Sequence, residues 1–498
     1  MTTLPLEIDR SRGEPIHRQI YDGLRRAILE GRIRPGHRIP STRGLAEELG
    51  VSRMPVLTAY DQLLHEGYLE GRVGSGTFVS GSLPDDFLRS TPPVAGGPGK
   101  GRRPRLPRPS IPDEGGLGPF RVSLPALDLF PHALWARLVA RHAHRMTHDQ
   151  MAYGDPAGLL SVREAIADHL RAARAVRCGA GQILIVSGSQ AALRLATAVL
   201  LTPGDRVAVE EPGYPGARDA LAAGGAELVP VPVDGEGMSV SALRRRGRVR
   251  AVHVTPSHQY PLGPSMSAGR RLALLDWAAR GEAWVLEDDY DSEYRYVSRP
   301  LGALQGMETH ERVIYMGTFS KVLFPAVRVG YVVVPPSLWE RFLRARQALD
   351  LFPPTLYQLA LADFLREGHF ARHLRRMRRV YLERRDALLT GLEQNCGDRL
   401  TVPNADAGLH VAALLEGGPS DVEVVRRLAG RGLAATALST CYAGASPQSG
   451  LLLGFGGSTP GKLLVATRVL GEVLRETEPG PGPVSRLWPV DAALGEEQ

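Results

Sequence analysis

A run of proline, glycine and arginine at residues 92–109 is the feature that most constrains the fold of this chain. The run reads Pro-Pro-Val-Ala-Gly-Gly-Pro-Gly-Lys-Gly-Arg-Arg-Pro-Arg-Leu-Pro-Arg-Pro, and its surroundings between Ser80 and Gly118 are similar in character. Such a segment cannot bury enough apolar surface to offset the entropy lost on ordering, so we expect a flexible linker over residues 81–117. Its arginines either add non-specific affinity for phosphate or only keep a tether solvated. The linker predicts at least two separately folded parts.

Composition limits the class of protein. With 498 residues the chain is too long for one core. No apolar run approaches the length of a membrane span, and the N-terminus lacks the apolar core of a signal peptide. The cysteines Cys178, Cys396 and Cys441 are few and far apart, which favours a reducing cytoplasm and indicates no metal site. A net charge of +7 permits contact with nucleic acid, but placement of the charges must decide it.

Three helices are predicted before the linker. Apolar residues recur at helical spacing over residues 15–30. A shorter helix is expected over residues 42–49, with Ser41 as its cap, and a third over residues 53–66, with Ser52 as its cap. Two short helices joined by a tight turn form a helix-turn-helix, whose second helix enters the major groove of DNA by its N-terminal residues.

A two-stranded ribbon with a glycine-rich tip is predicted over residues 68–79. Together with Leu-Ala-Glu-Glu-Leu-Gly-Val-Ser-Arg at residues 45–53, it resembles the winged helix-turn-helix of GntR-family regulators, an α+β domain placed here at residues 10–80. Arginine can pair with guanine or grip phosphate, and wing glycines let the backbone approach the sugar-phosphate edge. Pro55 departs from the family pattern, in which a threonine usually stands. The alternative is a structural module with exposed arginines. The residues that the resemblance implies as DNA contacts are Ser41, Arg43, Ser52, Arg53, Arg72, Gly74 and Thr77.

After the linker, short apolar strands alternate with helices. The alternation indicates an α/β fold with a largely parallel sheet, in which ligands bind at the carboxyl ends of the strands. Polar residues suited to chemistry follow several of these strands. The strands are expected at residues 183–186, 206–209, 251–254, 284–286 and 313–316.

Lys321 stands out because the only other lysines are Lys100 and Lys462. An amine can lose its proton and condense with an aldehyde, whereas guanidinium stays protonated. Asp288 and Tyr290 follow an earlier strand. An aldehyde-bearing pyridine cofactor needs a lysine for a Schiff base and an acid for its ring nitrogen. Ser-Gly-Ser-Gln at residues 187–190 opens a helix and is either a phosphate cradle or only a helix cap.

This order of motifs resembles the large domain of fold-type I, pyridoxal 5'-phosphate (PLP)-dependent aminotransferases. The resemblance implies PLP as cofactor and Lys321 as the catalytic residue that forms the aldimine. By the resemblance, Asp288 would pair with the pyridinium nitrogen and Tyr290 would hydrogen-bond the ring hydroxyl. Tyr214 would stack on the ring. Tyr153 would reach the phosphate of the other subunit, which implies a homodimer. The residues that would hold the phosphate are Gly188, Ser189, Gln190, Thr318, Ser320 and Arg328.

The two resemblances on one chain are typical of the MocR/GabR type of bacterial transcription regulator. Asp-Asp-Tyr-Asp-Ser-Glu-Tyr-Arg-Tyr at residues 288–296 and Thr-Pro-Ser-His-Gln-Tyr-Pro at residues 255–261 resemble that group. The resemblance places the aminotransferase-like domain at residues 118–478 and implies a domain-swapped dimer that reads two half-sites of an operator in double-stranded DNA. Residues 479–498 are expected to be a disordered tail.

Three functions compete: a regulator that senses a ligand, an aminotransferase with a DNA-binding appendage, and a cofactor-free scaffold. The joint presence of Lys321 and Asp288 argues against the scaffold. Aminotransferases of this fold commonly hold the substrate carboxylate with an arginine near the C-terminal part, and no arginine occurs between Arg431 and Arg468. Gly216 stands where relatives that respond to γ-aminobutyrate have a second arginine. We therefore expect a regulator whose effector is PLP itself or an amino compound that exchanges with Lys321.

Overall fold

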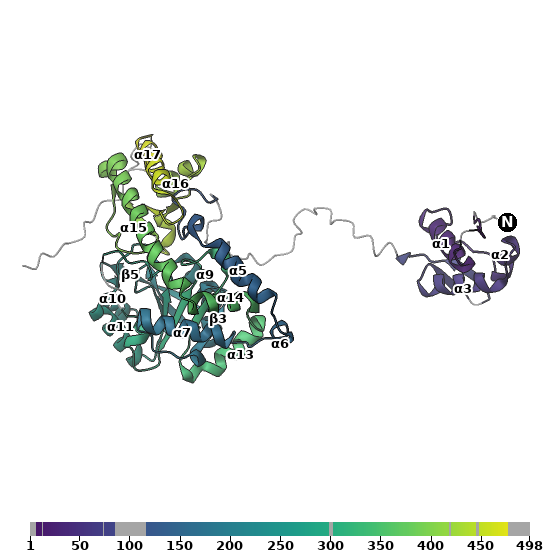
Figure 1. The fold of residues 1–498 in the computed structure, drawn as a ribbon, viewed down its shortest axis with the longest axis horizontal. Coiled ribbons are helices and arrows are strands. Elements are labelled where there is room, and N and C mark those ends of the chain that lie inside the picture. The colour runs from purple at the N-terminus through teal and green to yellow at the C-terminus, as the bar shows by residue number, and fades with distance from the viewer. Residues whose placement is uncertain are drawn as a thin grey trace, which may run out of the picture. The chain divides into compact units, whose positions relative to one another are not determined.

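The computed structural model describes residues 6–11, 13–72, 74–84, 116–297, 302–417, 420–444 and 448–476. The chain divides into two compact units, Met1–Arg105 and Leu106–Gln498, which Figure 1 shows as ribbons. Most of the predicted linker at 81–117 and the whole predicted tail at 479–498 lie outside the described residues.

Three helices form the first unit around a small apolar core. Ser41 caps the second helix, because its hydroxyl accepts a hydrogen bond from the Gly44 N–H at 3.1 Å. Ser52 occupies the N-cap position of the third helix, as the sequence predicts. Its side chain, however, makes no capping hydrogen bond. Leu24, Leu45 and Leu63 are among the buried residues that hold the bundle together. The helices are α1 (Ile16–Leu29), α2 (Thr42–Glu48) and α3 (Arg53–His65).

The predicted wing is an antiparallel ribbon of β1 (Leu69–Arg72) and β2 (Gly76–Val79). Glycine is required at its second strand, because Gly76 has φ +112° and an added Cβ would lie 2.9 Å from the Arg38 Nε atom. Val79 is buried against the helices, which fixes the ribbon to the bundle. The first unit is thus the winged helix-turn-helix that the sequence predicts.

An eight-stranded sheet forms the centre of the second unit, in the order β3-β10-β9-β8-β7-β4-β5-β6. Strands β4, β7, β8 and β9 are parallel, as the alternating pattern predicts, and they are joined by the parallel strand β5, which was not predicted. The sequence did not reveal that β10 is inserted antiparallel between β3 and β9. The strands are β3 (Ile183–Val186), β4 (Arg206–Glu211), β5 (Glu227–Asp234), β6 (Gly237–Met238), β7 (Ala251–Val254), β8 (Trp284–Asp289), β9 (Val313–Thr318) and β10 (Gly330–Val333).

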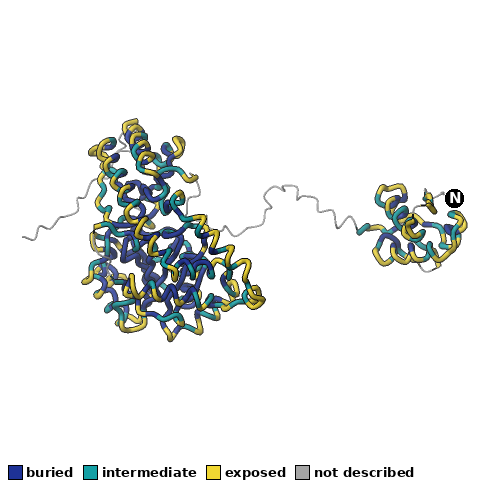
Figure 2. The backbone as a smooth tube through the Cα atoms, viewed as in Figure 1, coloured by how far each residue is buried: buried dark blue, intermediate teal, exposed yellow. Residues whose placement is uncertain are grey.

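Helices cover both faces of this sheet, so its strands lie in the buried interior of the tube in Figure 2. None of the described helices has the length and apolar character to cross a membrane. The helices around the sheet are α5 (His132–Ala143), α6 (His148–Met151), α7 (Leu160–Arg174), α8 (Ser189–Leu200), α9 (Pro215–Ala223), α10 (Val240–Arg245), α11 (Ala268–Arg280), α12 (Leu304–Met307), α13 (Trp339–Asp350) and α14 (Thr355–Arg366).

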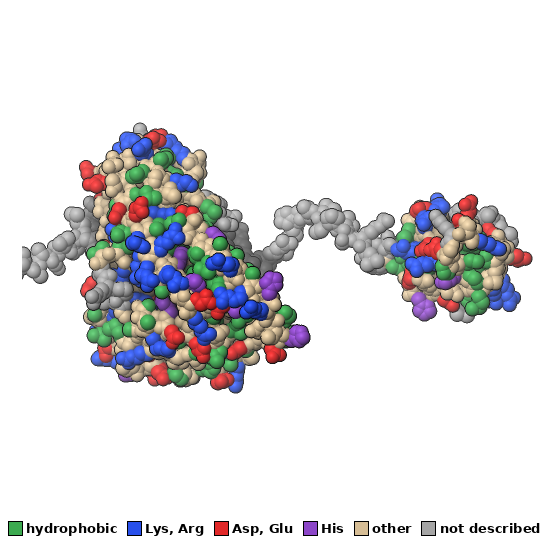
Figure 3. Space-filling view, viewed as in Figure 1, with side chains coloured by type: hydrophobic (Ala, Val, Ile, Leu, Met, Phe, Trp, Pro, Cys, Tyr) green, Lys and Arg blue, Asp and Glu red, His purple; other side chains and the backbone are tan. Residues whose placement is uncertain are grey.

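A smaller antiparallel sheet follows the long helix α15 (His369–Cys396), in the order β11-β12-β14-β13. Exposed arginines such as Arg375 and Arg379 lie along α15, and basic side chains gather in this region of the large unit in Figure 3. The remaining elements are β11 (Leu400–Thr401), β12 (His410–Leu415), α16 (Asp421–Gly430), β13 (Thr436–Ala437), β14 (Gly450–Gly454) and α17 (Pro460–Glu476).

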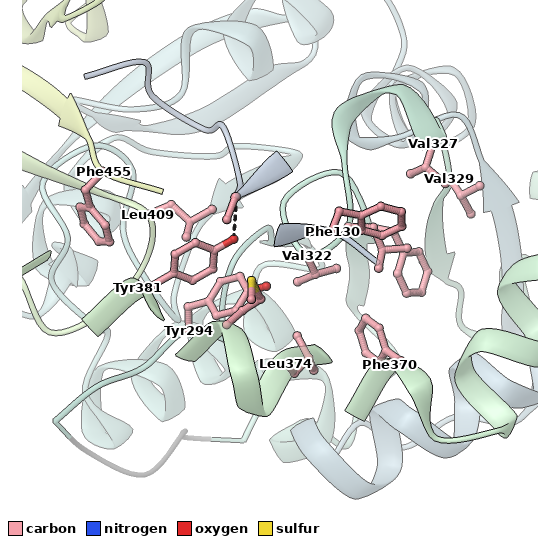
Figure 4. Packing of buried hydrophobic residues seen from close by; sticks show 14 of the residues in the cluster. Phe130, Tyr294, Val322, Val327, Val329, Phe370, Leu374, Tyr381, Leu409 and Phe455 are labelled. Carbon is pink, nitrogen blue, oxygen red and sulfur yellow. Dashed lines mark hydrogen bonds between the residues drawn. The ribbon is translucent and has the colours of Figure 1, made fainter. Parts of the chain in front are cut away.

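The segment that follows β9 is anchored in the largest apolar cluster of the described residues. Val322, Val327 and Val329 pack in that cluster with Phe130 and Phe370, as Figure 4 shows. Burying these side chains fixes the backbone next to Lys321, which precedes Val322, and on both sides of Arg328, which lies between Val327 and Val329. Lys321 and Arg328 are therefore carried by a loop that the core holds in place.

Candidate functional site

A cavity of about 200 Å³ lies at the carboxyl ends of the parallel strands. It collects residues that follow β3, β4, β7, β8 and β9, which are widely separated in sequence but meet at one edge of the sheet. Most of the residues predicted to bind a cofactor share this cavity. Its lining consists of Ser123, Ser189, Gln190, Tyr214, Thr255, Tyr260, Asp288, Tyr290, Thr318, Ser320, Lys321, Pro325 and Arg328.

One end of the cavity is suited to an anion. Helix α8 begins at Ser189, so its first backbone N–H groups and its positive dipole end face this region. Arg328 approaches so closely that a Cβ on Gly188 would lie 3.2 Å from the Arg328 Nη1 atom, and Gly188 has φ +103°. Arg328 itself adopts φ +49°, a conformation that non-glycine residues rarely hold without a functional or structural reason.

Two hydroxyl groups complete this end. Thr318 Oγ1 donates to Ser320 Oγ at 3.1 Å, and Thr318 Oγ1 accepts from the Ser320 N–H at 3.2 Å. Both side chains are buried. Hydroxyls, helix N–H groups and a guanidinium are the donors that a phosphate group requires.

Asp288 provides an acceptor deep in the cavity. Its Oδ1 atom is buried and has no hydrogen-bond partner in the described part of the chain. Its Oδ2 atom lies 3.5 Å from His253 Nε2, a neighbour that sequence reasoning missed because His253 sits inside the apolar strand β7. An unpaired buried carboxylate oxygen is costly, and a protonated ring nitrogen would satisfy it. The cavity therefore fits a pyridinium ring with a phosphate arm.

Lys321 is half-buried at the centre of the cavity. Burial lowers the pKa of its amine to about 8, although Asp291 and Asp288 favour the charged form. Its Nζ atom donates a hydrogen bond to the Ser123 carbonyl at 3.3 Å. Because the pKa is lowered toward neutrality, more of this amine is neutral at pH 7 than for an exposed lysine, and only the neutral amine attacks a carbonyl.

The aromatic residues surround the remaining space. Tyr214 OH accepts a hydrogen bond from Gln190 Nε2 at 3.3 Å, and the Tyr214 ring meets the Tyr260 ring edge-on. Tyr290 OH lies 2.9 Å from His258 Nδ1. Burial raises the pKa of the Tyr290 phenol well above its usual value, so the group stays protonated.

Arg121 is a second cation, besides Arg328, whose charge affects the pKa of Lys321. The charge of Arg121 also lowers the pKa of the Lys321 amine. Arg121 lies in the segment just after the predicted linker, two residues before Ser123, and neither residue was predicted from the sequence. The only signal that could have revealed them is their position at the start of the large unit, which does not show what they contact.

Tyr153 does not line the cavity. Its side chain is 86% exposed and makes an edge contact with Phe352. A second hollow of about 650 Å³ between α8, α9 and α13 shares Gln190 and Arg328 with the cavity, so the anion end opens toward this surface.

The predicted DNA contacts lie on two surfaces of the first unit. Arg43 and Arg53 are exposed near the N-terminal ends of α2 and α3, and Arg53 Nε donates to Thr42 Oγ1 at 3.2 Å. The wing carries Arg72, which pairs with Glu70 at 2.7 Å and lies over the Phe78 ring. Gly74 is at the tip with φ +73°, and Thr77 is half-buried on β2.

Comparison with known proteins relates each unit to a family. The model for "Aminotransferase class I and II" matches residues 127–453, and the model for "Bacterial regulatory proteins, gntR family" matches residues 16–79. Among solved structures, kynurenine aminotransferase of Pyrococcus horikoshii is 28% identical with a TM-score of 0.67, covering 72% of this chain and 90% of that one. The likeness to that enzyme confirms the fold-type I architecture of the large unit.

Relatives of nearly the same length contain both units. The chain is 43% identical over 462 residues to the probable rhizopine catabolism regulatory protein MocR of Rhizobium meliloti, covering 91% of this chain and 93% of that protein. It is 36% identical over 471 residues to the HTH-type pyridoxine biosynthesis transcriptional regulator PdxR of Corynebacterium glutamicum, covering 92% and 95%. The chain therefore belongs to the MocR/GabR-type transcription regulators, which join a GntR-family winged helix-turn-helix to an aminotransferase class I and II domain.

Proposed function

We propose that this chain regulates transcription by binding operator DNA with its first unit and PLP with its second, and that PLP or an amino compound at Lys321 changes how it holds DNA. One observation carries the proposal. A lysine amine with a pKa of about 8, an unpaired buried carboxylate oxygen and an anion-binding helix terminus line a single cavity in a chain that begins with a winged helix-turn-helix.

Each group in the cavity would have a defined task. When bound, PLP supplies an aldehyde that condenses with amines and a ring that withdraws electrons. Asp288 would accept a hydrogen bond from the ring N–H, the start of α8 and Arg328 would hold the phosphate, and Tyr214 would contact the ring. Lys321 would supply the amine, and Tyr290 would donate a hydrogen bond to the ring oxygen. The effector must favour one conformation over another, because a ligand with equal affinity for both shifts nothing.

A homodimer would complete the site. The anion end of the cavity opens into the 650 Å³ hollow, whose lining includes Leu349 and Asp350, and the side chains of Leu349 and of the next residue, Leu351, are exposed. A second copy of the chain on this surface would bury them and bring Tyr153 to its partner's phosphate site. Such a dimer would present two DNA-binding units to two half-sites.

Catalytic turnover distinguishes the regulator from an enzyme. When the PLP-loaded protein is mixed with a panel of amino acids and an α-keto acid, we expect at most about one conversion per site, because the described pocket lacks the C-terminal arginine clamp. Keto-acid product is measured over time, with Lys321→Ala as the blank. Many conversions per site at ordinary enzymatic rates of about 1 per second or more would favour the aminotransferase instead.

Arg53 tests the DNA-reading surface. Arg53→Ala is expected to weaken operator binding roughly tenfold or more, because a lost arginine contact to base or phosphate costs about 1–3 kcal/mol. Affinity is measured by fluorescence anisotropy at several salt concentrations. A reduced salt slope would identify a phosphate contact, and relaxed sequence preference a base contact.

Arg26→Ala is the matched control, because Arg26 is exposed in the last turn of α1 and is not a predicted contact. Equal affinities of the two variants would remove Arg53 from the DNA surface. Visible absorbance of bound PLP should be the same in both.

A further inference from the structure

A single nitrogen atom next to Tyr290, a residue that lines the cavity, faces three oxygen atoms. His258 Nδ1 lies 3.1 Å from each carboxylate oxygen of Asp291 and 2.9 Å from Tyr290 OH. The side chains of His258 and Asp291 are 4% and 3% exposed. His258 comes from the loop after β7, whereas Tyr290 and Asp291 follow β8, so two neighbouring strands build this arrangement.

The chemistry of these atoms fixes where the hydrogens lie. Burial raises the pKa of the Asp291 carboxyl, whereas the adjacent His258 favours its charged form. When that carboxylate is ionised it can only accept hydrogen bonds, so His258 Nδ1 is assigned the hydrogen. That N–H is shared between Asp291 and the Tyr290 oxygen, which then acts as an acceptor. The hydroxyl hydrogen of Tyr290 is left to point elsewhere, and Tyr290 lines the cavity.

We propose that His258, held by Asp291, is a positioning residue that orients the Tyr290 hydroxyl as a hydrogen-bond donor to the ring oxygen of PLP. The proposal rests on the proposed function, because it assigns a role toward the bound cofactor. His258 does not touch the reacting atoms itself. Its part is to donate its N–H to a lone pair of the Tyr290 oxygen, so that the phenol hydrogen is directed away from His258.

Packing holds the imidazole in this orientation. A Cβ on Gly408 would lie 2.1 Å from His258 Cε1, and Gly408 has φ +79°, so glycine there leaves room for the ring. The His410 ring lies 5.4 Å from the His258 ring, and burial lowers the pKa of His410 to about 3. His410 is therefore neutral and adds no charge beside His258. The other titratable groups whose charges act on Tyr290 are Glu210, Tyr260 and Asp288, and the charge of Lys321 acts on His410.

The proposal predicts a change in the proton affinity of the chromophore that PLP forms with Lys321. A hydrogen bond donated to the ring oxygen stabilises its negative charge and weakens the hold on the proton that the oxygen shares with the lysine nitrogen. Losing that donor should therefore raise the apparent pKa of the chromophore. The pKa is read from visible absorbance as a function of pH, on the full-length protein loaded with PLP.

A double-mutant cycle isolates the route of the effect. Tyr290→Phe removes the donor and is expected to raise the apparent pKa by about one unit or more. His258→Ala should raise it in the same direction by a smaller amount. The double variant should match Tyr290→Phe alone, because His258 acts only through the hydroxyl. His258→Asn, whose amide N–H can replace Nδ1–H, should restore part of the wild-type value.

The outcomes separate the inference from the proposed function. If His258→Ala shifts the pKa as much in the Tyr290→Phe background as in the wild type, the effect does not pass through Tyr290 and the inference is wrong. An unchanged pKa in both His258 variants overturns it as well. Absence of any Lys321-dependent absorbance in the wild-type protein would overturn the proposed PLP binding and the inference together. Far-UV circular dichroism checks each variant, and His258→Asn carries the test if His258→Ala does not fold.

Discussion

Lys321→Ala is expected to abolish the visible absorbance that PLP gives with the protein while leaving the fold and basal DNA binding intact. Among the residues that the structure describes, only this lysine lines the cavity, and an alanine cannot condense with an aldehyde. Burial that lowers the Lys321 pKa to about 8 means that removing the amine also relieves a desolvation cost, so no loss of stability is expected. Absorbance after addition of PLP and gel filtration provides the measurement.

Two matched variants sharpen this test. Lys321→Arg keeps a positive charge but cannot form the covalent bond, so its spectrum should match that of Lys321→Ala. Lys462→Ala removes an exposed lysine on α17 and should leave the spectrum unchanged. Full absorbance in Lys321→Ala would refute the assignment, and loss of absorbance in Lys462→Ala would place the chemistry elsewhere.

Arg174→Ala is expected to destabilise the large unit by about 3–5 kcal/mol, because it leaves the buried Asp289 without its ion pair. Arg174 Nε lies 2.9 Å from Asp289 Oδ2, and the two side chains are 3% and 1% exposed. Arg174 also donates to Ser257 Oγ at 2.5 Å, while Tyr315 OH donates to the same Asp289 oxygen. This network ties α7 to the carboxyl end of β8, next to Asp288.

Urea unfolding followed by tryptophan fluorescence measures the effect, because no tryptophan precedes Trp135 and the signal comes from the large unit alone. The control is Arg280→Ala, which breaks an ion pair with Asp276 whose side chains are 79% and 43% exposed. Exposed pairs contribute little, so this variant should unfold near the wild-type urea concentration. Equal destabilisation by the two variants would show that burial of the Arg174 pair is not what makes it important.

Local patterns predict the architecture well. Helical spacing before Gly31, the serine at position 41 and the glycine-rich tip of the wing are each read over a few residues, and the winged helix-turn-helix is confirmed. Five strands of the large unit are recognised because each is short, apolar and followed by polar residues, whereas β5 and β10 of the same sheet were not predicted. The antiparallel β10 is different: its sequence is as apolar as that of its parallel neighbours, and nothing local gives the direction of a strand.

The site is predictable only where chemistry marks a residue. A rare lysine, an aspartate at a strand end and a glycine-serine turn can each be recognised in the sequence, and the fold brings them to one cavity. Their roles toward PLP stay predictions. The Nδ1 hydrogen bonds of His258, the contact of Ser123 with Lys321 and the nearby charge of Arg121 depend on which loops meet across the sheet. Those contacts are set by tertiary packing between residues far apart in the sequence, so local sequence patterns do not predict them.

The antiparallel insertion of β10 places the anion end of the cavity at the junction of two paired strands, β3 and β10. Ser189 follows β3 and Arg328 precedes β10, and these two strands pair with each other at the margin of the sheet. A phosphate group bound by both Ser189 and Arg328 would link the two strands at that margin. A ligand that binds only the folded state adds its binding free energy to the free energy of unfolding. The lifetime of the regulator in the cell would then follow the supply of the vitamin-derived coenzyme, in addition to any effect of the coenzyme on the operator.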